Sequence, residues 1–327
     1  MENMKLLYTP ILLFAFILTV LLEKRILPIL NKKAEQPIYS EGPAWHSKKA
    51  GTPTMGGVAF LISISLILVL SCAFLFSFGE ADSAWSMILV LFYSVLNSAI
   101  GIIDDSIKLK RKSNGGLTPI QKLALQAVFA AIFLALRAYI FKDETNITIG
   151  DFTLKLGFLY YALAFIMLLG IVNCANLTDG IDGLAASVAF AIGLFYFFLS
   201  FICGFESSII SAAMVGASLG FLIFNINPAK VFMGDTGSLF LGALSVSQAF
   251  SLNTPFFSLF IFGVYIIEGI SVILQVAYFK ITKKRLFKMA PIHHHLEKCG
   301  MDEMKICMIG IIITLILSIP CYILYSL

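Results

Sequence analysis

Charged residues are scarce in this chain of 327 residues: Asp, Glu, Lys and Arg together make up 13% of the sequence, whereas hydrophobic residues make up 59%. Water-soluble globular domains typically carry about 25% charged residues. The composition therefore excludes an ordinary soluble domain and indicates an integral membrane protein.

Paired cysteines are also missing. The six cysteines are scattered, mostly within apolar runs, and none shows C-x-x-C spacing. We therefore interpret them as packing residues and not as disulfides or zinc ligands. No repeat, low-complexity block or linker divides the chain, so we expect residues 1–327 to form a single transmembrane domain. No RNA- or DNA-binding motif is visible, and no nucleic-acid partner is expected.

Apolar runs of about 20 residues, long enough to cross a bilayer, recur along the chain. They predict an all-α polytopic membrane protein with about ten transmembrane helices, and the first run is interpreted as a retained helix. The sixth and seventh runs are separated only by Gly204 and Phe205; without a turn there, every later loop would change sides. The runs cover residues 5–23, 56–77, 85–103, 119–141, 157–175, 183–203, 206–225, 237–252, 255–279 and 306–326.

The distribution of basic residues predicts the orientation, because Lys and Arg favour short cytoplasmic loops. If the N-terminus is outside, the loops after the odd-numbered runs face the cytoplasm. All basic residues except Lys5, Arg137, Lys142 and Lys155 then lie in these loops or in the first turn of the fourth run. We therefore expect both termini on the extracytoplasmic side. In an outer loop, residues 143–155 alternate apolar and polar side chains around Gly150 and Asp151, which indicates a small hairpin.

The unusual polar residues are concentrated in the predicted inner loops. Five clusters on one face, each at a helix end, indicate one convergent site. They are KKAGTPTMGG (48–57), DDSIKLKRK (104–112), NCANLTDGIDG (173–183), NINPAKVFMGDTGS (225–238) and MAPIHHHLEKCG (289–300).

Asp104 and Asp105 are expected to end a helix at the membrane surface. Two acids at such a place are common without any function. However, acids at a helix C-terminus oppose the helix dipole, which suggests a use in cation binding or proton transfer. Lys108 and Lys122 could neutralise phosphate nearby.

Asp179 and Asp182 are three residues apart at the expected start of a helix and would share one face. Aspartate is a good capping residue there, so a purely structural role is open. Asn173 and Asn176 upstream favour instead a site for a polar ligand.

Asp235 lies between Gly234 and Gly237, which is ordinary turn chemistry. The neighbouring Asn225 and Asn227 favour the other interpretation, since carboxylate and amide oxygens are the ligands that Mg²⁺ prefers. The two glycines would then let the backbone approach a bound nucleotide.

Three of the four histidines are consecutive, at 293–295. Consecutive residues cannot all point at one metal from a regular element, and the zinc spacings are missing, so the rings suit phosphate better. Glu268 stands in the middle of the ninth run; a carboxylate there is either functional or paired inside the bundle. The helix could also be broken at Gly269.

Taken together, these motifs resemble the polyprenyl-phosphate N-acetylhexosamine-1-phosphate transferase superfamily over essentially the whole chain. The resemblance rests on TPTMGG (52–57), Asp104-Asp105, NLTDGIDGLA (176–185), FMGDTGSL (232–239) and APIHHHLE (290–297). TPTMGG and PIHHHLE favour its muramoyl-pentapeptide branch over the N-acetylglucosamine-1-phosphate branch.

The resemblance implies transfer of phospho-MurNAc-pentapeptide from UDP-MurNAc-pentapeptide to undecaprenyl phosphate, giving lipid I and UMP for peptidoglycan synthesis. It further implies Mg²⁺ as cofactor, a homodimer, and a bacterial cytoplasmic membrane location with a cytoplasmic-facing site. The implied catalytic residues are Asp104, Asp105, Asp235, His293, His294 and His295, with Asp235 as the Mg²⁺ ligand. The implied substrate-binding residues are Lys49, Thr54, Lys122, Asn173, Asn176, Asp179, Asp182, Asn225, Phe232, Ser238 and Gln275.

We favour direct attack of the lipid phosphate on the β-phosphorus, with Asp104 or Asp105 deprotonating or orienting that phosphate. An aspartyl-phosphate intermediate is the alternative mechanism. An ion-coupled transporter is the alternative from another class, motivated by ten spans and Glu268, although transporter sites usually lie near the bilayer midplane. A non-catalytic scaffold is a third reading.

Overall fold

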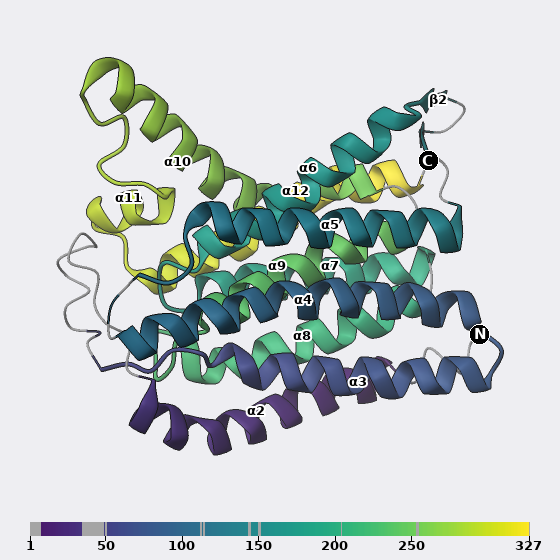
Figure 1. The fold of residues 1–327 in the computed structure, drawn as a ribbon, viewed down its shortest axis with the longest axis horizontal. Coiled ribbons are helices and arrows are strands. Elements are labelled where there is room, and N and C mark those ends of the chain that lie inside the picture. The colour runs from purple at the N-terminus through teal and green to yellow at the C-terminus, as the bar shows by residue number, and fades with distance from the viewer. Residues whose placement is uncertain are drawn as a thin grey trace.

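A computed structural model describes residues 8–34, 49, 51–111, 113, 115–142, 145–149, 152–203, 205–252 and 255–326. The fold is a bundle of helices with one small hairpin (Figure 1). The helices are α2 (Tyr8–Lys33), α3 (Gly57–Ser77), α4 (Ala81–Arg111), α5 (Pro119–Phe141), α6 (Phe158–Thr178), α7 (Leu184–Cys203), α8 (Phe205–Asn225), α9 (Gly234–Gln248), α10 (Gly263–Thr282), α11 (Ile292–Lys298) and α12 (Glu303–Ser326). Short 3-10 helices cover Ala249–Leu252 and Pro255–Leu259.

Each of the ten apolar runs overlaps a helix of this bundle, although the ninth begins with the 3-10 helix Pro255–Leu259 and α10 starts only at Gly263. Seven helices in the described part of the chain are long and apolar enough to cross a membrane: α3, α4, α5, α6, α8 from Ser208 onward, α10 and α12. Leu184–Ser200 of α7 is a shorter apolar helix. The chain is therefore a multi-pass membrane protein. Residues 5–7 of the first run lie outside the described residues.

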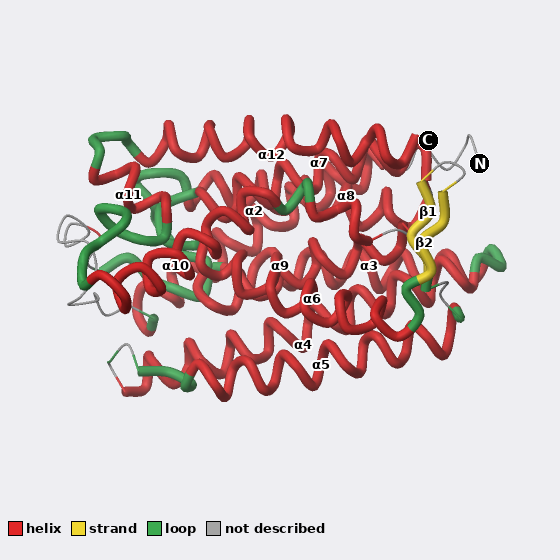
Figure 2. Tube along the Cα trace, turned by 90° about the horizontal axis from the view of Figure 1, so that it is seen from above, coloured by secondary structure: helices red, strands yellow, loops and turns green. Residues whose placement is uncertain are grey.

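The two ends of the bundle differ in character. Helix α11 and the loops around it lie at one end, whereas the hairpin and the last turn of α12 lie at the other (Figures 1 and 2). Strands β1 (Asn146–Ile149) and β2 (Phe152–Lys155) pair antiparallel, which confirms the predicted hairpin. Its turn residues Gly150 and Asp151 lie outside the described residues.

The chain reverses direction between α7 and α8, at the boundary on which the loop assignments depend. The two helices pack along each other, and Gly193 in the middle of α7 lies against Met214 and Val215 in the middle of α8. Both predicted runs are thus separate helices. Gly204 itself lies outside the described residues.

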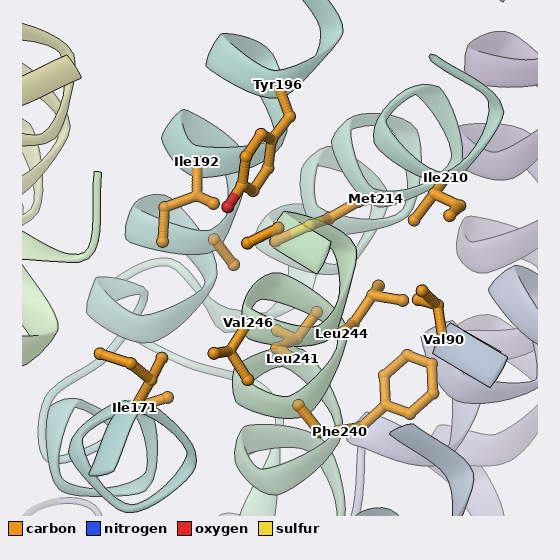
Figure 3. Packing of buried hydrophobic residues seen from close by; sticks show 14 of the residues in the cluster. Val90, Ile171, Ile192, Tyr196, Ile210, Met214, Phe240, Leu241, Leu244 and Val246 are labelled. Atoms are coloured by element: carbon orange, nitrogen blue, oxygen red, sulfur yellow. The ribbon is translucent and has the colours of Figure 1, made fainter. Parts of the chain in front are cut away.

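Helix α9 occupies the centre of the bundle, in contact with α3, α4, α6 and α7 (Figure 2). Every residue from Thr236 to Gln248 is buried. Figure 3 shows Phe240, Leu241, Leu244 and Val246 of this helix surrounded by apolar side chains from α4, α6, α7 and α8. Because lipid tails are as apolar as these side chains, close packing stabilises the bundle more than hydrophobic burial does.

Small residues allow the neighbours of α9 to approach its backbone. A Cβ atom added at Gly57 of α3 would lie 2.3 Å from the Cα atom of Gly237, and one added at Gly101 of α4 would lie 2.3 Å from the carbonyl oxygen of Asp235. These contacts give Gly237 a role in helix packing that the sequence did not predict. The start of α9 is thereby held between α3 and α4.

Two expected helix ends were wrong. Helix α4 continues to Arg111, so Asp104 and Asp105 lie inside the helix and basic residues occupy its last turn, where they suit the dipole. Helix α7 begins only at Leu184, so Asp179 and Asp182 stand in the preceding turn.

Helix α10 is not broken at Gly269, because it runs without interruption from Gly263 to Thr282. Gly269 instead lets Cys174 of α6 come close: a Cβ atom added there would lie 2.3 Å from the sulfur. Helix α10 leans away from the bundle (Figure 1), and many of its apolar side chains are exposed.

We predict that Gly57→Ala destabilises the bundle, because the added methyl group would collide with the backbone at Gly237. Overpacking of this kind lowers the free energy of unfolding by about 1–3 kcal/mol, measurable as a lower unfolding temperature in detergent. Gly170→Ala in α6 is the matched control, since nothing lies within 4 Å of its added methyl group. Equal stability of the two variants would contradict the proposed close packing.

Candidate active site

The carboxylates of Asp104, Asp105 and Asp235 form one cluster, with an oxygen from each lying within 4.8 Å of the others. The first two belong to α4 and the third to the first turn of α9. We call these three residues the carboxylate cluster. The sequence prediction that they share one site is consistent with this geometry.

Two lysines bind the carboxylate cluster. Lys108, one turn beyond Asp104 on α4, places its Nζ 2.7 Å from Asp104 and 3.2 Å from Asp235. The Nζ of Lys122 lies 2.9 Å from Asp104 and 2.5 Å from Asp235. Three carboxylates and two ammonium groups leave one negative charge uncompensated.

Lys122 reaches the cluster because of the way α5 starts. The Thr118 hydroxyl accepts a hydrogen bond from the backbone N–H of Gln121, and the Gln121 side chain accepts one from the backbone N–H of Thr118. Pro119 fills the first helical position. This capping box with proline is a strong helix start, so Lys122 is held in the first turn of α5.

Asp105 supports the start of α9. Its carboxylate accepts hydrogen bonds from the backbone N–H of Thr236 at 3.0 Å, the Thr236 hydroxyl at 2.7 Å and the backbone N–H of Asp235 at 3.3 Å. A carboxylate at a helix N-terminus satisfies donors that have no partner within the helix and suits the dipole. Asp105 therefore fixes the position of Asp235.

Gly234 explains how the three carboxylates come so close. Its φ is +70°, a conformation that glycine adopts easily, and a Cβ atom there would lie 2.7 Å from both Asp105 and the Thr54 hydroxyl. Like Gly237, this glycine therefore makes room for neighbouring protein groups. Thr54 is buried beside it, and its backbone N–H donates to Ala34.

Asn176 extends the site onto α6. Its side-chain amide donates to Asp235 at 3.0 Å and to the Ser238 hydroxyl at 2.8 Å. Asn173, one turn earlier, donates to Gln126 of α5 and so ties α6 to the helix that carries Lys122. Asn176 thus contacts the carboxylate cluster directly, Ser238 is linked to it through Asn176, and Asn173 bonds to Gln126 instead.

Asp179 stands in the turn after α6, outside the membrane-spanning segment. Burial raises the pKa of its carboxyl group well above its usual range, and the negative charges of Asp235 and Asp105 raise it further. A raised pKa favours the protonated form, which can donate a hydrogen bond as an ionised carboxylate cannot.

Asp182 and Lys49 lie in a second cluster. The buried Asp182 accepts hydrogen bonds from Lys49 at 2.7 Å, the backbone N–H of Ala229 at 2.9 Å and Asn227 at 3.2 Å. Glu303, at the start of α12, lies 2.8 Å from the Lys49 Nζ and accepts the backbone N–H of Asp182. These contacts join three loops to α12 and do not include the carboxylate cluster.

Asn225 and Phe232 shape the segment that leads into α9. The Asn225 side chain accepts the backbone N–H of Gly183 and donates to the carbonyl of Val231. The backbone N–H of Phe232 donates to Pro53, and its carbonyl accepts from Gly56. Pairing of this segment with the TPTMGG loop links two motifs that are far apart in sequence.

The three histidines point in three directions from α11. His293 is fully buried, and its Nδ1 lies 3.0 Å from the carboxylate of Glu268. The Nδ1 of His294 lies 2.6 Å from Glu297. His295 faces the preceding loop, where its Nδ1 accepts the backbone N–H of Lys288.

Gln275 lies apart from the carboxylate cluster. Its side chain accepts the backbone N–H groups of Leu286 and Phe287 and donates to the carbonyl of Phe287. Its contacts therefore brace the loop between α10 and α11.

Comparison with known proteins supports the family suggested by the motifs. Residues 86–253 match the model of glycosyl transferase family 4, and residues 49–61 match signature 1 of phospho-N-acetylmuramoyl-pentapeptide-transferase. The chain is 43% identical over 298 residues to the phospho-N-acetylmuramoyl-pentapeptide-transferase of Bacillus subtilis, covering 90% of each chain. The protein of that name from Clostridium botulinum (strain Eklund 17B / Type B) is 41% identical over 311 residues, covering 94% of this chain and 93% of its own.

The chain belongs to the phospho-N-acetylmuramoyl-pentapeptide-transferase family. Its members are transferases, so the transporter and scaffold readings are set aside. Membership also favours the muramoyl-pentapeptide branch over the N-acetylglucosamine-1-phosphate branch, as the motifs indicated.

Some residues of the site were not predicted individually. Lys108 was noted only as a neighbour of the two acids, although it contacts all three carboxylates. Its spacing of three and four residues from them on one helix was the available signal. Glu303 and Gln126 carried no signal, because their partners are more than 40 residues away in sequence.

We predict that Asp105→Ala destabilises the protein even without substrate, because the backbone N–H of Thr236 and its hydroxyl would be left buried without this acceptor. Unsatisfied groups of this kind cost about 1–3 kcal/mol, and thermal unfolding in detergent measures the loss. Glu80→Ala, at an exposed position before α4, is the control. An unchanged unfolding temperature for Asp105→Ala would show that α9 does not need this acceptor.

Proposed function

We propose that this protein transfers phospho-MurNAc-pentapeptide from UDP-MurNAc-pentapeptide to undecaprenyl phosphate, releasing UMP and forming lipid I for peptidoglycan synthesis. The observation that carries the proposal is the convergence of three carboxylates and two lysines from α4, α5 and α9 in a chain of this family. Phosphoryl transfer depends mainly on charge neutralisation and positioning, which such a cluster provides.

The exposed face of the cluster is the part that meets substrate. The side chains of Lys108, Lys122 and Asp235 keep 16–21% of their surface exposed, whereas Asp104 is fully buried and Asp105 keeps 3%. In this proposal the two ammonium groups bind and orient the phosphates of the nucleotide sugar and the lipid. Asn176 holds Asp235 in place from the α6 side.

The donor set fits Mg²⁺, with Asp235 as the proposed ligand. Two oxygens on one Mg²⁺ lie at most about 4.2 Å apart, twice the usual bond length. The oxygens of the cluster lie within 4.8 Å of one another, slightly beyond this limit, so a single Mg²⁺ bound by all three carboxylates would require them to move closer together. Water commonly completes the shell of this ion. When bound, Mg²⁺ would supply charge neutralisation at the diphosphate.

Asp104 is the better candidate for orienting or deprotonating the lipid phosphate. Asp105 accepts hydrogen bonds from the start of α9. Asp104 instead accepts one from the backbone N–H of Leu117, and it forms ion pairs with the same two lysines as Asp235. A phosphate bound by those lysines would lie next to Asp104. Since a phosphate monoester has its second pKa near 6, orientation contributes more than deprotonation at neutral pH.

The same proposal includes the arrangement in the membrane. All ten helices from α2 to α10 and α12 cross a bacterial cytoplasmic membrane as a single catalytic domain, both termini lie outside, and the site faces the cytoplasm. The distribution of Lys and Arg supports this orientation. A homodimer is proposed from the resemblance alone.

We expect Asp235→Asn to lower Mg²⁺-dependent UMP release by about 100-fold or more, because the variant loses a charge aimed at the reacting phosphates. It should also weaken binding of Mn²⁺, a spectroscopic substitute for Mg²⁺, in electron paramagnetic resonance. Asp302→Asn, an exposed carboxylate beside α12, is the control. Wild-type protein that releases no UMP would refute the proposed function, and an active Asp235→Asn variant would remove only the metal assignment.

Direct attack predicts no release of UMP from enzyme that lacks a lipid acceptor. Rapid-quench measurement with UDP-MurNAc-pentapeptide and Mg²⁺ should therefore show no stoichiometric burst. A burst equal to the enzyme concentration would establish the aspartyl-phosphate alternative.

A further inference from the structure

Glu268 is a buried carboxylate on a membrane helix, and its hydrogen bonds go to a single residue. Its Oε2 lies 3.0 Å from the Nδ1 of His293 and 3.4 Å from the backbone N–H of the same residue. Within the described part of the chain, no lysine or arginine forms an ion pair with it. The carboxylate of α10 is thus directed entirely at α11.

The contact between Nδ1 and Oε2 leaves the second ring nitrogen, Nε2, available for another partner. In the doubly protonated form of the ring, Nδ1–H donates to Oε2 and Nε2–H is a second donor. We take His293 to be in this form.

This donor has no hydrogen-bond acceptor among the described residues, and it is buried. It faces the turn that follows α6: a Cβ atom added at Gly180 would lie 2.2 Å from Nε2. The turn also carries Asp179, whose carboxyl group is close enough to Asp235 and Asp105 for their negative charges to raise its pKa. The unpartnered N–H therefore points at the edge of the candidate active site.

We propose that Glu268 is a positioning residue, which holds the His293 ring so that its Nε2–H donates a hydrogen bond to a phosphate oxygen of bound substrate. This inference rests on the proposed function. Because the Gly180 turn covers Nε2, the contact forms when that turn shifts on substrate binding. Glu268 acts only through His293 and touches no substrate itself.

A double-mutant cycle, measured by UMP release, tests whether Glu268 acts through His293. Glu268→Gln and His293→Asn are each expected to lower kcat/KM by about 10- to 100-fold, the loss of one charge-assisted hydrogen bond. In the His293→Asn background, Glu268→Gln should cause no further loss. An equal loss in both backgrounds would make Glu268 merely structural and overturn the proposal. Glu80→Gln is the control for removal of an exposed carboxylate.

The two phosphate sources are separated by kinetics at varied concentrations of each substrate. A higher KM for UDP-MurNAc-pentapeptide in Glu268→Gln assigns the contact to the diphosphate, and a higher KM for undecaprenyl phosphate assigns it to the lipid. A lower kcat with unchanged KM values assigns the contact to the transition state. Unchanged kcat and KM values would overturn the proposal.

A spectroscopic experiment tests the pairing of Glu268 with His293 even if the protein releases no UMP. The protein has only four histidines, so few signals appear in the NMR spectrum of protein labelled with ¹⁵N-histidine. The signals of His293 are identified as those that disappear in His293→Asn. Glu268→Gln should move the Nδ1 signal, and an unmoved signal would overturn the pairing. Wild-type inactivity with a moved signal would refute the proposed function but not the pairing.

Gly180→Ala perturbs the same ring from the other side. The added methyl group would displace Nε2, so we expect a loss of kcat/KM similar to that of His293→Asn. Gly170→Ala, with open space around its added methyl group, is the matched control. Full activity of Gly180→Ala would overturn the proposed direction of Nε2.

Discussion

Asp105 accepts hydrogen bonds from the backbone at Asp235 and Thr236, so the charge of one carboxylate determines where another one stands. This interaction joins α4 to the start of the central helix α9. The close contacts at Gly57 and Gly101 hold the same turn from two sides. The remaining parts of the site depend on it, because Lys108, Lys122 and Asn176 all bind the carboxylate of Asp235.

The start of α9 also brings the negative charge of Asp235 close to those of Asp104 and Asp105. The positive charges of Lys108 and Lys122 reduce the resulting repulsion. Three carboxylates with oxygens inside 4.8 Å would repel one another strongly in a partly buried site. Lys108 and Lys122 offset most of that repulsion and remain partly exposed. The site thus keeps an excess of negative charge beside two partly exposed ammonium groups, as the proposed binding of a cation and of phosphates requires.

The helices were predictable from sequence because the bilayer sets a length of about 20 apolar residues, and seven of them in the described part of the chain are long and apolar enough to cross a membrane. The hairpin at 146–155 was predictable from its alternation. The position of helix ends was not: α4 runs past Asp104 and Asp105 to Arg111, and α7 starts after Asp182, because hydropathy marks where a chain leaves the apolar region and not where its hydrogen bonds end. Gly269 showed the same limit, since packing against Cys174 and a helix break both call for glycine.

The sequence by itself determined that the chain is a membrane protein, which loops carry the polar motifs and which family those motifs resemble. Residue type and spacing along the chain suffice for these conclusions. Only the tertiary structure decided which motifs meet: Asp235 faces Asp104, Asp105 and both lysines, whereas Asp182 and Lys49 pair with Glu303, and Glu268 faces His293. These partners lie 25 to 254 residues apart in sequence, so no local pattern encodes the contact. For Asp235 the contact depends on the glycines that let α3 and α4 approach the start of α9.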